Sequence, residues 1–230
     1  MKYKNLFFDL DDTIWAFSQN ARETFEEVYH NYSLDLYFDS FDHYYMLYQR
    51  RNTELWLEYG EGKITKEELN YQRFLFPLQS VGLNDEAFAK QFSEDFFAII
   101  PTKTGLMPYA KEVLEYLSPK YNMYILSNGF RELQSHKIRS AGVDIYFKKV
   151  ILSEDIGKLK PSPEVFNFAL SATQSNLRRS LMIGDSWEAD ITGAYRVGMA
   201  QAFYNVTERT SFPFHPTYQI RSLKELMDLL

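Results

Sequence analysis

The feature that most constrains the fold is a regular alternation of short apolar strands with helices after about residue 105. Strand patterns in this part occur at residues 121–126, 149–152, 181–183 and 200–204, with a possible edge strand at 218–220. Helical patterns lie between them, and the apolar run Leu6–Phe8 adds a strand near the N-terminus. Alternation of this kind predicts a parallel sheet covered by helices on both faces.

Residues 17–100 interrupt this alternation with helical patterns only. Phe25, Val28 and Tyr32 have helical spacing, and Thr65-Lys66-Glu67-Glu68 is a capping box that predicts a helix start. We therefore expect an α/β fold with two parts. Residues 1–15 and 101–230 are predicted to form the sheet core, and residues 16–100 an all-helical cap inserted after the first strand.

Composition narrows the class of protein. The 230 residues include no cysteine, which excludes disulfides, thiolate metal sites and cysteine catalysis. The net charge is −6 with no basic run, so we expect no nucleic-acid polymer as partner. No apolar stretch reaches membrane-spanning length, and the N-terminal apolar run is too short for a signal peptide. We expect a cytoplasmic protein that is not bound to a membrane, and the oligomeric state stays open.

The segment Asp9-Leu10-Asp11-Asp12-Thr13 follows the first strand directly. Asp9 and Asp11 would share a face in an extended chain, and carboxylates this close repel each other unless a cation is present. Oxygen ligands with room for water suit Mg²⁺, and an adjacent carboxylate can attack phosphorus. The alternative is a solvated turn in which Asp12 and Thr13 cap the next helix.

Three further segments follow predicted strands or precede a helix. Ser127-Asn128-Gly129 can hold phosphate oxygens through a hydroxyl and backbone N–H groups. Lys160 precedes Pro161 and a helix start, and Gly184-Asp185-Ser186 begins a run that reaches Asp190. Each segment alone is also typical of an ordinary turn or surface. Their common place at one sheet edge favours a ligand site.

The order Asp-x-Asp-x-Thr, Ser-Asn, Lys-Pro and Gly-Asp-Ser-x-x-x-x-Asp resembles the haloacid dehalogenase-like hydrolase superfamily over nearly the whole chain. The resemblance implies a Rossmann-like core and a Mg²⁺-dependent phosphohydrolase. Asp11 favours phosphoryl transfer, because the dehalogenase branch lacks a second aspartate. The segments at residues 55–59, 62–65, 127–130 and 222–226 look like the bacterial noncanonical pyrimidine 5'-nucleotidases, although Ser127 stands where threonine is frequent.

The resemblance implies a role for each core residue. Asp9 would be the nucleophile, and Asp11 the acid for the leaving alcohol and then the base for water. Mg²⁺ would be held by Asp9, Asp185 and the backbone carbonyl of Asp11, and Mn²⁺ or Co²⁺ can also support such a site. Phosphate oxygens would be bound by Ser127, Asn128 and Lys160. Supporting roles fall to Ser186 and Asp190.

Substrate choice is assigned to the cap, because the core would contact only phosphate. Trp56 and Tyr59, with Phe130 of the core, are the candidate substrate contacts. Arg50, Arg51 and Arg73 are interpreted as solvated positions that could alternatively meet an anionic or carbonyl group. The expected substrate is a nucleoside monophosphate. The alternatives are sugar phosphates or other small phosphoesters, a phosphomutase, and a non-enzymatic phospho-acceptor module.

Overall fold

The computed structural model describes residues 2–230. The chain forms two compact units. The core unit comprises Met1–Ser18 and Lys103–Leu230, and the helical unit comprises Gln19–Thr102. None of the helices within residues 2–230 is both long and apolar enough to cross a bilayer. Action of the helical unit as a cap stays a prediction.

The core unit contains a six-stranded sheet in the order β3-β2-β1-β4-β5-β6. Every neighbouring pair is parallel, which confirms the predicted α/β class. This order is that of a Rossmann-like doubly wound sheet. The strands are β1 (Asn5–Phe8), β2 (Asn122–Ser127), β3 (Lys149–Leu152), β4 (Ser180–Gly184), β5 (Ala200–Tyr204) and β6 (Tyr218–Ile220).

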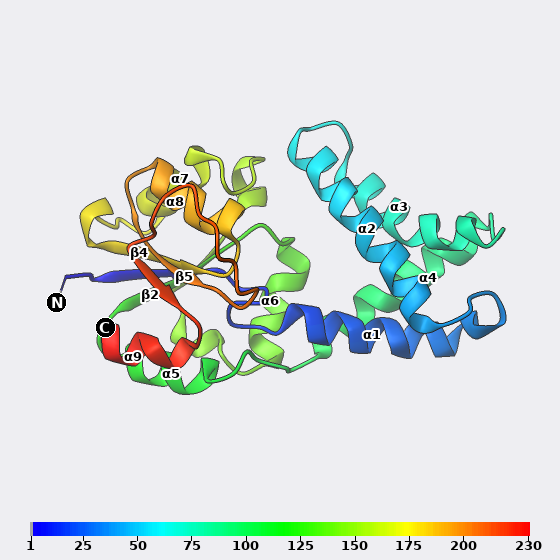
Figure 1. Cartoon of the computed structure of the whole chain (residues 1–230), viewed down its shortest axis with the longest axis horizontal. Coiled ribbons are helices and arrows are strands. Elements are labelled where there is room, and N and C mark those ends of the chain that lie inside the picture. Colours follow the sequence, from blue (N-terminus) through cyan, green and yellow to red (C-terminus); the bar gives the residue numbers. More distant parts are fainter. Residues whose placement is uncertain (1) are drawn as a thin grey trace. The chain divides into compact units, whose positions relative to one another are not determined.

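Helices lie on both faces of this sheet, with α7 and α8 opposite α5 and α9 (Figure 1). On one face, Phe7 of β1 aligns with Tyr124 and Met182 of its two neighbouring strands, and all three pack with Phe166 of α7. Apolar residues of central parallel strands are buried in this way because helices cover both faces. The helices are α5 (Ala110–Leu117), α6 (Arg131–Ser140), α7 (Pro163–Ala172), α8 (Thr192–Arg196) and α9 (Leu226–Leu229).

Strand β1 lies at the point where the strand order reverses. It pairs with β2 on one side and with β4 on the other. Crevices for ligands form beyond the carboxyl ends of the strands at such a switch point. Asp9 follows β1 directly and Asp185 follows β4, so the topology places both carboxylates at this point.

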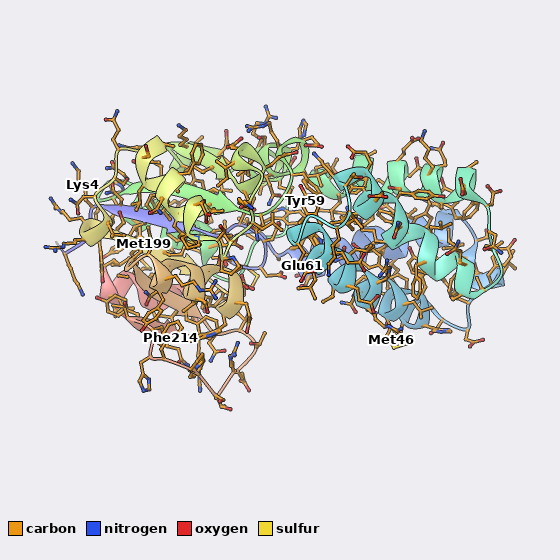
Figure 2. The ribbon with its side chains drawn as sticks, turned by 90° about the horizontal axis from the view of Figure 1, so that it is seen from above. Lys4, Met46, Tyr59, Glu61, Met199 and Phe214 are labelled. Atoms are coloured by element: carbon orange, nitrogen blue, oxygen red, sulfur yellow. The ribbon has the colours of Figure 1, made fainter. Side chains whose placement is uncertain are left out.

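The helical unit contains α2 (Phe41–Gly60), α3 (Lys66–Ser80), α4 (Glu86–Ile99) and most of α1 (Phe17–Asn31). Phe25 of α1 lies at its centre and contacts aromatic rings from α2, α3 and α4. Thr65 caps α3, and the predicted capping box with Glu68 is confirmed. Tyr59 and Glu61 mark the end of α2 in Figure 2. Short helical turns occur at Leu34–Leu36, Ile100–Thr102, Asp144–Tyr146, Ser153–Ile156, Leu177–Arg179 and Leu223–Glu225.

Arg73 of α3 departs from its interpretation as a solvated residue. Its side chain is buried, with hydrogen bonds to the amide oxygens of Asn52 and Asn70 and with its guanidinium over the rings of Phe74 and Phe97. Its Nε atom has no hydrogen-bond partner, and no described carboxylate forms an ion pair with it. Burial therefore lowers the pKa of Arg73, and the charge is retained at an energetic cost.

We expect Arg73→Met to stabilise the helical unit, because it replaces a buried unpaired charge by an apolar chain of similar length. The rise should be about 1–2 kcal/mol in local unfolding free energy, measured by hydrogen exchange of the α2 and α3 amides. Arg50→Met is the matched control, because Arg50 is 70% exposed, and it should change this value by less than about 0.5 kcal/mol. Faster exchange in Arg73→Met would mean that the guanidinium holds the helices together.

Candidate active site

The ammonium of Lys160 is the centre of the polar cluster at the switch point. Its Nζ atom donates to Asp9 Oδ1 at 2.5 Å, to Asp190 Oδ1 at 2.6 Å and to the carbonyl oxygen of Leu126 at 2.7 Å. The Lys160 side chain is only 2% exposed. All three donor positions of the ammonium are thus occupied, and its location is fixed by β1, β2 and the turn after β4.

Burial and charge act together on this cluster. Burial alone would lower the pKa of Lys160, but the carboxylates of Asp190 and Asp9 raise it above its usual value. Burial also raises the pKa of Asp9 well above its usual range; Lys160 opposes this effect, and the carboxylates of Asp190 and Asp185 add to it. The single positive charge of Lys160 therefore does not neutralise all the carboxylates around it.

Asp185 is held by the N-terminal acidic segment. Thr13 Oγ1 donates to Asp185 Oδ1 at 2.8 Å, and the Asp185 N–H donates to Thr13 Oγ1 at 3.1 Å. Burial, followed by the charge of Asp190, raises the pKa of Asp185 to about 7. In the alternative interpretation of the acidic segment Thr13 would cap the next helix, whereas the structure places its hydroxyl between the end of β1 and Asp185 after β4.

Asp190 enters the cluster from a π-helical turn, Trp187–Ile191. Its Oδ2 accepts the Ser186 N–H at 3.1 Å while its Oδ1 contacts Lys160, so both oxygens have protein donors. Ser186 Oγ accepts the Ala189 N–H and caps the turn. A β-carbon at position 184 would lie 2.2 Å from Asp190 Oδ2, so glycine is required there.

The residues at this site fit a divalent cation. One carboxylate oxygen from each of Asp9, Asp185 and Asp190 lies within 4.8 Å of the others. With Lys160 as the cation among them, two negative charges are uncompensated when all three are ionised. A hard divalent cation with oxygen ligands, such as Mg²⁺, matches both the donor type and the charge.

Ser127 and Asn128 lie at the end of β2, beside the same cluster. Ser127 Oγ accepts hydrogen bonds from Gly129 N–H at 3.0 Å and Gln134 Nε2 at 2.7 Å, which leaves its hydroxyl proton to be donated. The Asn128 side chain accepts the Lys160 N–H at 2.8 Å and donates to the Lys160 carbonyl at 3.1 Å. Asn128 therefore fixes the backbone of Lys160.

The Asp11 side chain turns to α6 instead of joining the three other carboxylates. Its Oδ2 accepts Gln134 Nε2 at 2.8 Å, and its Oδ1 accepts Lys137 Nζ at 2.7 Å. Neither of these partners was predicted from the sequence, because Gln134 and Lys137 belong to none of its motifs. The available signal was the placement of two polar residues, three apart, on the helix that begins directly after the Ser-Asn-Gly turn.

The candidate substrate contacts are divided between the two units. Phe130 is buried at the start of α6. Trp56 and Tyr59 belong to the helical unit, where both are half-buried on α2 with their ring centroids 5.8 Å apart. Their roles toward a substrate stay predictions, as does metal binding by the Asp11 backbone.

Comparison with known proteins identifies the family. The haloacid dehalogenase-like hydrolase model matches residues 3–198. The HAD-hydrolase YfnB of Bacillus subtilis is 30% identical over all of this chain and 96% of its own length. The magnesium-bound crystal structure of YfnB superposes with a TM-score of 0.89 at 28% identity, covering 100% of this chain and 99% of YfnB.

Two further relatives have named substrates. The pyrimidine 5'-nucleotidase YjjG of Escherichia coli is 30% identical, with 100% of this chain and 99% of YjjG covered. A ribulose-1,5-bisphosphate 5-phosphatase of Halopiger xanaduensis is 26% identical, with 98% of each chain covered. Both relatives are named for removal of phosphate from a small molecule.

The stabilisation of the folded protein by added Mg²⁺ should depend on pH, because Asp185 titrates in the range concerned. Because folding raises its pKa to about 7, the folded protein holds this proton more tightly than the unfolded chain, and metal-free stability falls as pH rises from about 4 to about 7. Binding of Mg²⁺ by Asp185 would require loss of that proton. The melting-temperature rise on adding Mg²⁺ should therefore be larger near about pH 8 than near about pH 5.5.

Asp185→Asn should raise the metal-free melting temperature near about pH 8 by about 2–4 °C and abolish the Mg²⁺ shift. Glu188→Gln is the matched control: this carboxylate lies three residues away but is 74% exposed, and the Mg²⁺ shift should be unchanged. A Mg²⁺ shift that persists in Asp185→Asn would contradict the metal assignment.

Proposed function

Since the chain belongs to the haloacid dehalogenase-like hydrolase family, we propose that it is a Mg²⁺-dependent phosphohydrolase acting on nucleoside 5'-monophosphates through an aspartyl-phosphate on Asp9. The observation that carries this proposal is the buried excess of negative charge around Asp9 at the switch point of the sheet. A site of this kind suits a divalent cation and the phosphate that the cation neutralises.

In the first step, an Asp9 carboxylate oxygen forms a bond to phosphorus as the bond from phosphorus to the ester oxygen breaks. No described donor contacts Asp9 Oδ2, so this oxygen is available for attack or for metal binding. Asp11 supplies the proton that the leaving alkoxide needs. The products are the alcohol and an aspartyl-phosphate.

In the second step, Asp11, now ionised, takes a proton from water as the water oxygen attacks phosphorus. The bond from phosphorus to the Asp9 oxygen breaks, which releases phosphate and regenerates the Asp9 carboxylate and the protonated Asp11 acid. The acid of the first step is therefore the base of the second, and the enzyme returns to its starting protonation state.

Asp9 and Asp185 would hold Mg²⁺, while Asp190 positions Lys160. The chemistry that bound Mg²⁺ supplies is an offset of the repulsion between the Asp9 carboxylate and the phosphate dianion. Lys160, whose three N–H donors are engaged by the protein, would stabilise phosphoryl oxygens through its charge, and Ser127 through its donating hydroxyl. Asn128 contributes its backbone N–H, since its side chain is committed to the Lys160 backbone.

The nucleotide preference is supported by similarity to YjjG and by the aromatic pair on α2. Because the core contacts assigned above all involve phosphate, we assign recognition of the base to the helical unit. Trp56 and Tyr59 offer half-buried rings on which a base can stack. The similarity to a sugar-bisphosphate phosphatase makes sugar phosphates the second candidate substrate class.

The test is inorganic phosphate release, in Mg²⁺, from a panel of nucleoside 5'-monophosphates and sugar phosphates. We expect multiple turnovers and a preference for pyrimidine nucleotides. Asp9→Asn should lower the rate to background, because an amide cannot form the covalent intermediate. Release of at most one phosphate per chain would instead support a phospho-acceptor module, and isomerisation without release would support a phosphomutase.

Trp56→Leu tests base recognition separately from chemistry. Loss of one stacking ring should raise KM for a pyrimidine nucleotide by about tenfold. KM for glycerol phosphate should be unchanged, because this ester has no aromatic ring to stack. Equal changes in KM for both substrates would mean that Trp56 does not recognise the base. The proposed phosphatase mechanism would be unaffected by that result.

A further inference from the structure

Two polar residues of α6, Gln134 and Lys137, have no role in the mechanism derived above. Both are buried, and each contacts one oxygen of the Asp11 carboxylate. Residues three apart lie on the same face of a helix, so a single helix delivers both contacts. We propose that Gln134 and Lys137 are positioning residues that fix the Asp11 carboxylate for proton transfer, an inference that rests on the proposed phosphatase function.

Lys137 is held by more than its ion pair. Its ammonium is 4.6 Å from the ring centroid of Trp15 and 5.0 Å from that of Phe17. Trp15 is itself fixed, since its Nε1 donates to the Lys103 carbonyl. The side chain of Lys137 is only 3% exposed. Burying an ammonium costs more folding free energy than burying an apolar side chain of similar size. The presence of Lys137 here is therefore better explained by its contact to Asp11 than by stability.

Gln134 joins the acid to the phosphate site. Its Nε2 donates both to Asp11 Oδ2 at 2.8 Å and to Ser127 Oγ at 2.7 Å. It also depends on Gly129, because a β-carbon at that position would lie 2.2 Å from Gln134 Nε2. The Ser-Asn-Gly turn therefore has a second purpose, which is to leave space for the residue that orients Asp11.

The amide of Gln134 suits both protonation states of Asp11. Its Nε2 donates to the ionised carboxylate, and its buried Oε1 has no hydrogen-bond partner. Rotation of the amide by half a turn would present Oε1 as an acceptor for the protonated acid. Each carboxylate oxygen also keeps a second lone pair, so the contacts fix Asp11 without blocking proton transfer.

The test compares two phosphate esters that differ in their need for an acid. The nucleoside of a nucleoside 5'-monophosphate leaves as an alkoxide and needs the proton of Asp11, whereas the p-nitrophenolate of p-nitrophenyl phosphate leaves without one. In single-turnover assays of alcohol release, Lys137→Met should slow nucleoside release by roughly 10- to 100-fold and p-nitrophenol release by less than about threefold. In steady-state assays, KM for both esters should be the same in Lys137→Met as in the wild-type protein. Lys137→Arg should restore part of the rate of nucleoside release.

Two further variants distinguish positioning from a structural role. In an Asp11→Asn background, Lys137→Met should cause no additional slowing, because the group that it positions is already absent. Gln134→Leu should slow nucleoside release more than p-nitrophenol release, although its contact to Ser127 adds a loss common to both esters, and this variant keeps the proposal testable if Lys137→Met fails to fold. Arg139→Met removes an exposed cation from the same helix and should leave both rates unchanged.

Equal slowing of both esters, or independent effects of Lys137→Met and Asp11→Asn, would overturn the positioning role and leave the proposed function standing. Failure of the wild-type protein to release either alcohol is a separate result. It would overturn the phosphatase function and, with it, the positioning role.

Discussion

The contact on which the rest of the site depends is the Lys160 ammonium between Asp9 and Asp190. It brings together the end of β1, the π-helical turn after β4 and the carbonyl of Leu126 on β2, and the Asn128 side chain accepts the backbone N–H of Lys160. Without this cation, the surrounding buried carboxylates could not all ionise. With it, the cluster keeps an excess of negative charge that one divalent ion can compensate.

Most of the fold could be predicted because its signals are local. Strands β3, β5 and β6 occur within the predicted bounds, and the capping box at Thr65 begins α3 as expected. Arg73 was interpreted wrongly because the same pattern of charges on a helix describes both a solvated face and a buried one. Burial of its guanidinium depends on Phe97, which comes from another helix and is not adjacent in the sequence.

Part of the candidate site could likewise be predicted from local motifs, and part depends on tertiary packing. Motif order identified the residues that meet at Lys160, since residues at the carboxyl ends of parallel strands converge whatever lies between them. The partners of Asp11 could not be found in this way, because Gln134 and Lys137 lie inside a helix and carry no motif. Their contacts depend on the rotation of α6 about its axis, which tertiary packing sets.

The neighbouring carboxylates of residues 9–12 have different hydrogen-bond partners and therefore different surroundings. Asp9 contacts Lys160, Asp11 contacts α6, and Asp12 accepts hydrogen bonds from the backbone and hydroxyl of Ser18 in the first turn of α1. Thr13 holds Asp185. Asp9 and Asp11 thus have separate lysines, so the nucleophile and the acid of the proposed mechanism would lie two residues apart in different surroundings. One ammonium shared by both would tie their charges together, whereas with two the proton transfer proposed for Asp11 would leave the Lys160 contact to Asp9 in place.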